Sequence, residues 1–180
     1  MNIPNSLSVF RILLVPVFVW VYLTGQTDAY FYIAAAVLVV SGLTDKLDGL
    51  IARRYNMITE LGRFLDPFAD KLTQAAVVVC LAVRFPAVTW LAALFIAKEA
   101  AMALGAVFLT KEKIKIASAQ WYGKFYTFAF YVSMTLVVAF TPRLSAKWVF
   151  VILAALAAPM LFSFIMYIPV FLSLNRKKED

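Results

Sequence analysis

Four aspartates lie close together in the sequence, in two narrowly spaced pairs. Asp45 and Asp48 are three residues apart, and Asp66 and Asp70 are four residues apart. Spacings of three and four place both members of a pair on one face of a helix. Carboxylates that approach one another repel unless a cation lies among them. The pattern therefore predicts a metal site in which all four aspartates provide oxygen ligands.

The residue types in the chain restrict which metal such a site would hold. There is no histidine, and the one cysteine, Cys80, lies in a long apolar run away from the aspartates. Zinc is usually held by cysteine and histidine, whereas carboxylate oxygens suit hard cations. We therefore expect Mg²⁺ or Mn²⁺, with two ions favoured by the number of carboxylates.

Small residues and an arginine accompany the aspartates. Gly49 directly follows one aspartate, Gly62 lies four residues before another, and Ala52 comes one turn after the first pair. A missing side chain lets a ligand or a second helix come close. Arg53 offers a planar set of donors that suits phosphate. Any one of these residues alone is as often a packing or helix-end residue, but their shared spacing with the aspartates favours a site.

The elements that position these residues are apolar helices. Hydrophobic residues make up 64% of the 180 residues, more than a soluble chain of this size could bury. A membrane-spanning helix needs about 20 mostly apolar residues. The apolar runs predict six spans, over residues 7–24, 29–52, 61–83, 87–109, 119–140 and 146–173. We therefore expect an all-α integral membrane bundle that forms a single domain over residues 1–180.

Charge predicts how the bundle is oriented. Lysine and arginine are scarce in the connection at 25–28 but gather in the connections at 53–60 and 110–118 and at the C-terminus. The positive-inside rule places both termini in the cytoplasm, in agreement with an even number of spans. The short connection 53–60 joins two antiparallel helices, so the two aspartate pairs should face each other near the cytoplasmic surface. The net charge of +7 is then explained by basic residues that set the membrane topology or contact anionic lipid headgroups, rather than by binding to nucleic acid.

A longer motif contains the aspartates. It reads Asp45-x2-Asp48-Gly49-x2-Ala52-Arg53-x8-Gly62-x3-Asp66-x3-Asp70. With every fixed position present, it resembles the signature of the CDP-alcohol phosphatidyltransferase family. A second similarity is the opening stretch, which reads Asn2-Ile3-Pro4-Asn5 and is followed by Arg11 and Pro16. This stretch resembles the phosphatidylglycerophosphate synthase and cardiolipin synthase branches, and the likeness covers the first five spans.

The resemblance implies a reaction and a role for each motif residue. Family members move a phosphatidyl or related group from a CDP-linked donor to an alcohol and release CMP. By resemblance, Asp45, Asp48 and Asp66 bind metal, and Asp70 joins the metal site or acts as general base. The residues implied to line the CDP pocket are Gly49, Ala52, Arg53, Gly62 and Asp66. Such a site would lie at the cytoplasmic face of a bacterial inner membrane or a plasma membrane, with CDP-diacylglycerol as donor.

The acceptor alcohol is less well determined by the sequence. Phosphatidylglycerophosphate synthases carry Arg-Glu in the fourth span, a nearby arginine, and Gly-Lys-x-Lys-Thr in the fifth. This chain has Lys98-Glu99, Ala106 at the later arginine position, and Tyr126 where a second lysine would follow Lys124. The resemblance implies that the acceptor is bound by Lys98, Glu99 and Lys124. Glycerol 3-phosphate is the first choice, phosphatidylglycerol (a cardiolipin synthase) a close second, and inositol phosphate is less favoured.

Other interpretations stay open. Lys98 and Glu99 lie mid-span, where an ion pair between helices explains them about as well as substrate contact. The chain could also be a non-enzymatic membrane protein that binds divalent cations, although its acidic residues cluster at one depth and provide no continuous polar path. Homodimers are common in the family, but we find no dimer interface in this sequence.

Overall fold

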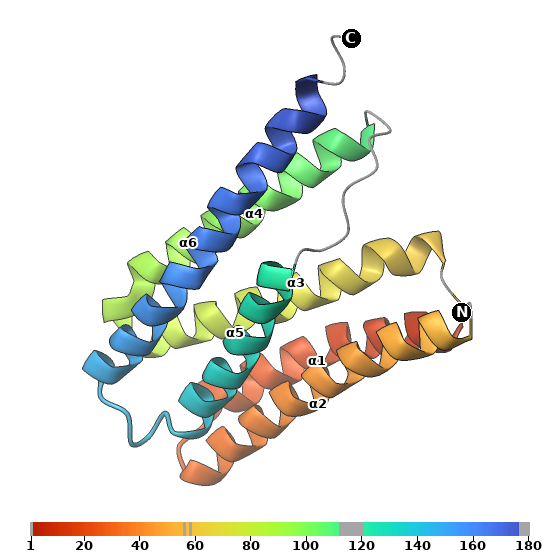
Figure 1. Cartoon of the computed structure of the whole chain (residues 1–180). Coiled ribbons are helices and arrows are strands. Elements are labelled where there is room, and N and C mark those ends of the chain that lie inside the picture. Colours follow the sequence, from red (N-terminus) through yellow and green to blue (C-terminus); the bar gives the residue numbers. More distant parts are fainter. Residues whose placement is uncertain (1, 56, 58, 112–120, 177–180) are drawn as a thin grey trace.

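The computed structural model describes residues 2–55, 57, 59–111 and 121–176, apart from the side chains of 53, 63, 103–111, 121–124, 163 and 167–176. It is all-helical within these ranges. The helices are α1 (Ile3–Thr24), α2 (Asp28–Arg54), α3 (Glu60–Arg84), α4 (Thr89–Lys111), α5 (Trp121–Ala139) and α6 (Ala146–Arg176). A 3₁₀ turn, η1 (Pro86–Val88), separates α3 from α4. The six predicted helices are therefore present (Figure 1).

Polar caps set where two of the helices begin. Asn2 caps α1 by accepting a hydrogen bond from the Asn5 amide. Thr59 caps α3 by accepting one from the Gly62 amide at 3.0 Å. Such caps satisfy amide groups that have no partner within the helix. Both capped ends lie at the end of the bundle where the aspartates are found.

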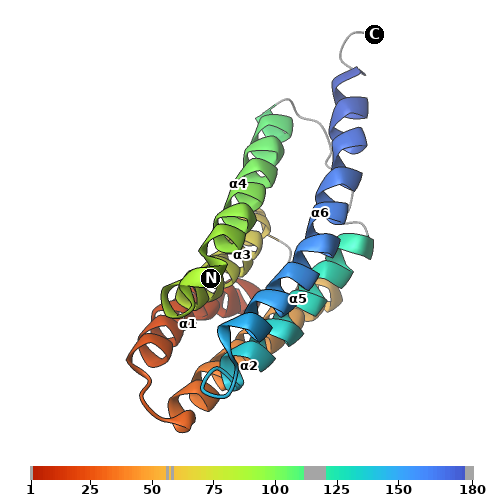
Figure 2. The same cartoon turned by 90° about the vertical axis from the view of Figure 1, so that its left-hand side faces the viewer.

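The helices pack as two neighbouring groups. α1 lies against both α2 and α3, while α4 and α6 run beside each other, and α5 lies between α2 and α6 (Figures 1 and 2). Aromatic and aliphatic side chains fill the contact between α1, α2 and α3. Its fully enclosed members include Phe18, Tyr22, Phe31, Leu38, Val77 and Leu81. This packing fixes the positions of α2 and α3, which carry the motif, relative to α1.

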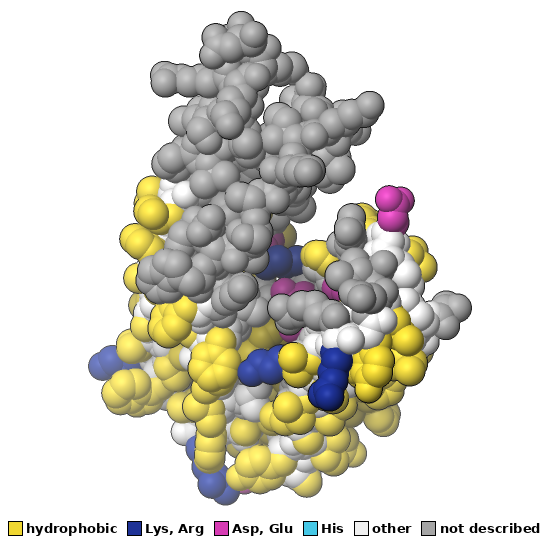
Figure 3. Space-filling view, turned by 45° about the vertical axis from the view of Figure 1, so that its right-hand side comes forward, with side chains coloured by type: hydrophobic (Ala, Val, Ile, Leu, Met, Phe, Trp, Pro, Cys, Tyr) yellow, Lys and Arg dark blue, Asp and Glu magenta, His cyan; other side chains and the backbone are white. Residues whose placement is uncertain are grey.

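Large apolar side chains also cover much of the outer surface (Figure 3). In the described part of the chain, three segments are long and apolar enough to cross a membrane: Ile3–Thr24, Asp28–Ala52 and Ala146–Met166. Phe125–Ala139 is a shorter apolar helix. In α3, by contrast, the apolar stretch is interrupted by charged residues in its first turns, up to Lys71. Apolar surface of this extent is suited to lipid, and the chain is a multi-pass membrane protein.

Candidate active site

Three of the four predicted aspartates meet at one arginine. Nη1 of Arg11, on α1, donates to Oδ1 of Asp45 on α2. Nη2 donates to Oδ2 of Asp48 at 2.8 Å. The same nitrogen lies 4.0 Å from Oδ1 of Asp66 on α3. One guanidinium thus joins the three helices at the motif.

Arg11 was not among the predicted site residues. Its side chain is 0% exposed, as expected for a group surrounded by protein on every side. From the sequence we assigned it to the family-like opening stretch. One signal could have identified it: an arginine within an apolar run has to find a partner inside the protein, because an unpaired charge there is costly.

Asp66 has a second partner on α1. The hydroxyl of Ser8 donates to Oδ1 of Asp66 and also lies 3.1 Å from the carbonyl of Pro4. Ser8 is buried and is three residues before Arg11, so both side chains are on the same face of α1. This face of α1 therefore provides both a neutral donor and a charged donor to the aspartates.

Gly62 lies in the first turn of α3, against Asn5 of α1. Thr59 Oγ1 lies 3.1 Å from Oδ1 of Asn5 and donates to it. A Cβ placed on Gly62 would be 2.8 Å from that same Asn5 oxygen and 3.1 Å from Thr59 Oγ1. Real Cβ atoms essentially never show contacts below 3.0 Å, so Asn5 would have to shift, whereas Thr59 would have to give by a few tenths of an ångström. The missing side chain thus makes room for Asn5 of a second helix, and a role in binding CDP stays a prediction.

Asp70 has a different environment from the other aspartates. Its Oδ1 accepts a hydrogen bond from the Tyr131 hydroxyl on α5, and its Oδ2 accepts one from Nε2 of Gln74, each at 2.9 Å. Within the described residues it forms no ion pair with Arg11. Both partners are neutral, and within the described part of the chain no cation contacts this carboxylate directly. A group of this kind can accept a proton from an attacking hydroxyl.

Two of the predicted acceptor residues, Lys98 and Glu99, form part of a charge cluster beside Asp70. Glu99 Oε2 pairs with Nζ of Lys71 at 2.9 Å, and its Oε1 pairs with Nζ of Lys98 at 2.5 Å. Lys98 Nζ also lies 5.1 Å from the centre of the Tyr126 ring. Two lysines share one glutamate, so the cluster has a net charge of +1. Lys71 was not predicted, although its place directly after a motif aspartate was a sequence signal.

The structure gives fewer contacts for the remaining predicted site residues. Gly49 and Ala52 lie on α2 beside the first aspartate pair, and the Ala52 carbonyl accepts from the Met57 amide at 3.0 Å. The side chains of Arg53, Ala106 and Lys124 lie outside the described side chains. The roles predicted for these residues therefore stay predictions.

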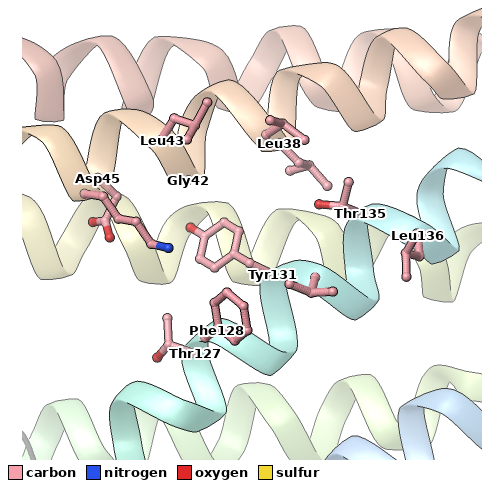
Figure 4. A pocket seen from close by; sticks show the side chains of 12 residues that line it. Leu38, Gly42, Leu43, Asp45, Thr127, Phe128, Tyr131, Thr135 and Leu136 are labelled. Carbon is pink, nitrogen blue, oxygen red and sulfur yellow. The ribbon is translucent and has the colours of Figure 1, made fainter.

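An apolar cavity of about 650 Å³ opens between α2 and α5 beside the aspartates. Its lining residues are Leu38, Val39, Gly42, Leu43, Asp45, Lys46, Thr127, Phe128, Tyr131, Val132, Thr135 and Leu136. Figure 4 shows Asp45 at one end, with Tyr131 projecting into the space between the helices. The cavity thus leads from a polar end at the site to an apolar end between α2 and α5.

The donor set suits a divalent cation. In the part of the chain that the structure describes, no group of three or more Asp, Glu or Cys side chains is arranged around a shared ion-sized space. Instead, three aspartates face Arg11, whose single charge leaves them with excess negative charge. Asp45 and Asp66 are each 37% exposed at their side chains, so an ion can reach them from outside. Carboxylate oxygens with uncompensated charge fit Mg²⁺ or Mn²⁺, which would share these ligands with Arg11.

Comparison with known proteins gives consistent matches. The family model described as CDP-alcohol phosphatidyltransferase matches residues 1–175. A "Cardiolipin synthase (CMP-forming)" of Streptomyces coelicolor is 37% identical over 71% of this chain and 60% of its own length. A "Probable phosphatidylglycerophosphate synthase" of Mycobacterium tuberculosis is 34% identical over 76% of this chain and 66% of its own length. A "CDP-diacylglycerol--glycerol-3-phosphate 3-phosphatidyltransferase" of Shigella flexneri is 34% identical over 93% of both chains. This chain therefore spans less than two thirds of the first two relatives and nearly all of the third.

Proposed function

The chain belongs to the CDP-alcohol phosphatidyltransferase family, and we propose that it transfers a phosphatidyl group from CDP-diacylglycerol to an alcohol and releases CMP. The observation that carries this proposal is the division of the aspartates. Asp45, Asp48 and Asp66 gather at one point with excess negative charge, while Asp70 beside them is held by the neutral side chains of Tyr131 and Gln74. A diphosphate donor and an acceptor hydroxyl need these two different environments.

The donor half of the reaction needs the charge of the diphosphate to be balanced. We propose that Asp45, Asp48 and Asp66 hold Mg²⁺ or Mn²⁺, as two ions, with Asp70 at the edge of that site. When bound, the metal would neutralise the diphosphate and stabilise the departing CMP. Beside the metal, Gly49, Ala52, Arg53, Gly62 and Asp66 would form the pocket for CDP.

The acceptor half needs a base at the attacking oxygen. Asp70 would accept the proton from the acceptor hydroxyl as that oxygen attacks the phosphorus of the phosphatidyl group. Tyr131 and Gln74 hold one carboxylate oxygen each at 2.9 Å, which fixes the direction in which the remaining lone pairs point. These two residues would therefore orient the base.

The apolar cavity provides a place for a lipid chain. Its volume of about 650 Å³ and its apolar lining suit an acyl chain, and Asp45 and Lys46 lie at its polar end. A diacylglycerol substrate has this same division, with a charged head and apolar tails. The cavity supports a lipid donor entering between α2 and α5 from the bilayer.

Glycerol 3-phosphate is the acceptor that we propose first. The cluster of Lys71, Lys98 and Glu99 holds a net positive charge near Asp70 and would attract the acceptor phosphate, with Lys124 as a further contact. Phosphatidylglycerol is the alternative, which one observation favours. Tyr126 is buried under the Lys98 ammonium and replaces a cation with an aromatic ring. A phosphodiester acceptor carries less charge than a phosphate monoester and needs fewer cations.

The bundle would cross the membrane six times with both termini in the cytoplasm. The basic connections and the even number of helices support this orientation. The aspartates lie near the C-terminal end of α2 and in the first turns of α3, so the site would open at the cytoplasmic surface. There, CDP stays in water while the acyl chains stay in lipid. Homodimer formation stays a prediction drawn from the family resemblance.

The test is a transferase assay on purified protein with CDP-diacylglycerol and Mg²⁺ or Mn²⁺. Glycerol 3-phosphate, phosphatidylglycerol and inositol phosphate are offered separately, and CMP release is compared. The proposal expects CMP release to depend on the metal and to be fastest with glycerol 3-phosphate. Faster release with phosphatidylglycerol would favour the cardiolipin synthase alternative. Metal binding without CMP release with any acceptor would contradict an enzymatic role.

A further inference from the structure

Arg11 holds the carboxylates that the divalent cation needs. We propose that Arg11 is an internal counter-cation of the site, which holds Asp45, Asp48 and Asp66 together and lowers their affinity for a divalent cation. The inference rests on the proposed function in one respect, namely that these aspartates bind the metal. It adds a positioning residue on α1, outside the aspartate motif.

The geometry makes Arg11 and a metal ion competitors for the same charge. Each of its two Nη atoms donates to a different aspartate of α2, and Nη2 is also 4.0 Å from the Asp66 carboxylate of α3. The guanidinium is 0% exposed, so solvent does not screen it from the carboxylates. One positive charge therefore offsets part of the negative charge that would attract a cation.

The strength of this competition follows from Coulomb's law. Even with the dielectric constant of bulk water, a unit charge about 4 Å from a divalent cation changes its affinity by about thirtyfold. Dielectric constants inside proteins are lower, so this is a conservative value. Removing the charge of Arg11 should therefore tighten binding of a divalent cation by at least about tenfold.

Other contacts between α1 and α3 would remain without Arg11. Asn2 Nδ2 donates to the Met57 carbonyl at 2.9 Å, Thr59 donates to Asn5 at 3.1 Å, and Ser8 donates to Asp66. These contacts join the start of α1 to the connection between α2 and α3 and to α3 itself, and they do not involve the guanidinium. A variant without the charge should therefore still fold, with a lower melting temperature because the aspartates then repel one another.

The experiment compares Arg11→Met, Arg11→Lys and Arg143→Met in full-length protein. Arg143→Met is the matched control, because Arg143 pairs with Asp28 at 3.0 Å on an exposed part of the surface. Mn²⁺ affinity is measured by electron paramagnetic resonance, and the melting temperature is measured in EDTA and in Mn²⁺. We expect Arg11→Met to melt lower than wild type in EDTA, to bind Mn²⁺ at least about tenfold more tightly, and to gain more from Mn²⁺. Arg11→Lys should stay near the wild-type affinity, and the control should match wild type throughout.

Several results would overturn the inference. An Arg11→Met protein with unchanged or weaker Mn²⁺ affinity would show that Arg11 is structural only. If this variant does not fold in EDTA, Mn²⁺ must restore it, and a protein unfolded in both conditions would also contradict the proposal. Absence of Mn²⁺ binding in wild type and variant alike would remove it as well. These readouts need no turnover, so a wild-type protein that releases no CMP would contradict the proposed function while leaving this test decisive.

Discussion

Substitution of Gly62 by alanine tests how closely α1 and α3 approach at the site. The new Cβ would stand 2.8 Å from Oδ1 of Asn5 and 3.1 Å from Oγ1 of Thr59. To relieve the contact, Asn5 has to move, which breaks its hydrogen bond with Thr59 and disturbs the cap that Thr59 gives to α3. Loss of a cap costs about 1 kcal/mol, and overpacking costs about 1–3 kcal/mol more. Replacing glycine in a helix recovers about 0.5–1 kcal/mol. We therefore expect a net loss of about 1–3 kcal/mol.

Gly42→Ala is the matched control for this substitution. Gly42 also lies in a helix, but a Cβ there would meet only the Tyr131 ring at 3.6 Å, an ordinary contact. Thermal unfolding in the same detergent should therefore give a melting temperature for Gly42→Ala at or above that of wild type. Gly62→Ala should melt lower than both. A Gly62→Ala protein that unfolds like Gly42→Ala would refute this explanation and leave CDP binding as the reason for the glycine.

Four further substitutions test the roles of single side chains. Asp70→Asn should reduce CMP release about a hundredfold or more in a folded protein, and robust release would exclude Asp70 as the base. Asp45→Asn should raise the Mg²⁺ or Mn²⁺ concentration needed for half-maximal rate, whereas an unchanged metal dependence would remove it from the ligands. Tyr131→Phe should lower kcat about tenfold with little change in metal dependence, because it removes one donor to Asp70. Lys71→Met should raise KM for glycerol 3-phosphate about tenfold and leave KM for CDP-diacylglycerol unchanged; equal changes in both would point to a structural role.

The apolar runs and the polar residues between them predicted the helices well. The predicted span 29–52 corresponds to α2 (Asp28–Arg54), and 146–173 corresponds to α6 (Ala146–Arg176). Helix ends differ by a few residues because the caps and the polar first turns extend the helices beyond their apolar parts. The spacing of the aspartates predicted two pairs that face each other directly across neighbouring helices. The structure instead joins Asp45, Asp48 and Asp66 through Arg11 of α1, which packs against both α2 and α3, and places Asp70 with Tyr131 and Gln74.

The side chains that contact the aspartates could not be predicted from the local sequence pattern. Arg11 lies more than thirty residues from Asp45 in the sequence, and helical periodicity says nothing about which helix covers which face. Lys71 and Tyr131 are similar cases, because each contacts a side chain on another helix. Lys71 of α3 pairs with Glu99 of α4, and Tyr131 of α5 donates to Asp70 of α3. The cavity beside Asp45 arises from the shape left between α2 and α5. Local pattern thus singled out the aspartates, while the side chains that contact them emerged only from packing.

The most direct measurement follows the labelled acceptor into lipid. Purified protein is incubated with CDP-diacylglycerol, Mn²⁺ and radiolabelled glycerol 3-phosphate, and both the lipid fraction and free CMP are measured. We predict label in the lipid fraction in equal amount to CMP, lost in EDTA and in Asp70→Asn. A folded protein that binds Mn²⁺ but transfers no label and releases no CMP, with glycerol 3-phosphate or with phosphatidylglycerol, would contradict the assignment of phosphatidyl transfer.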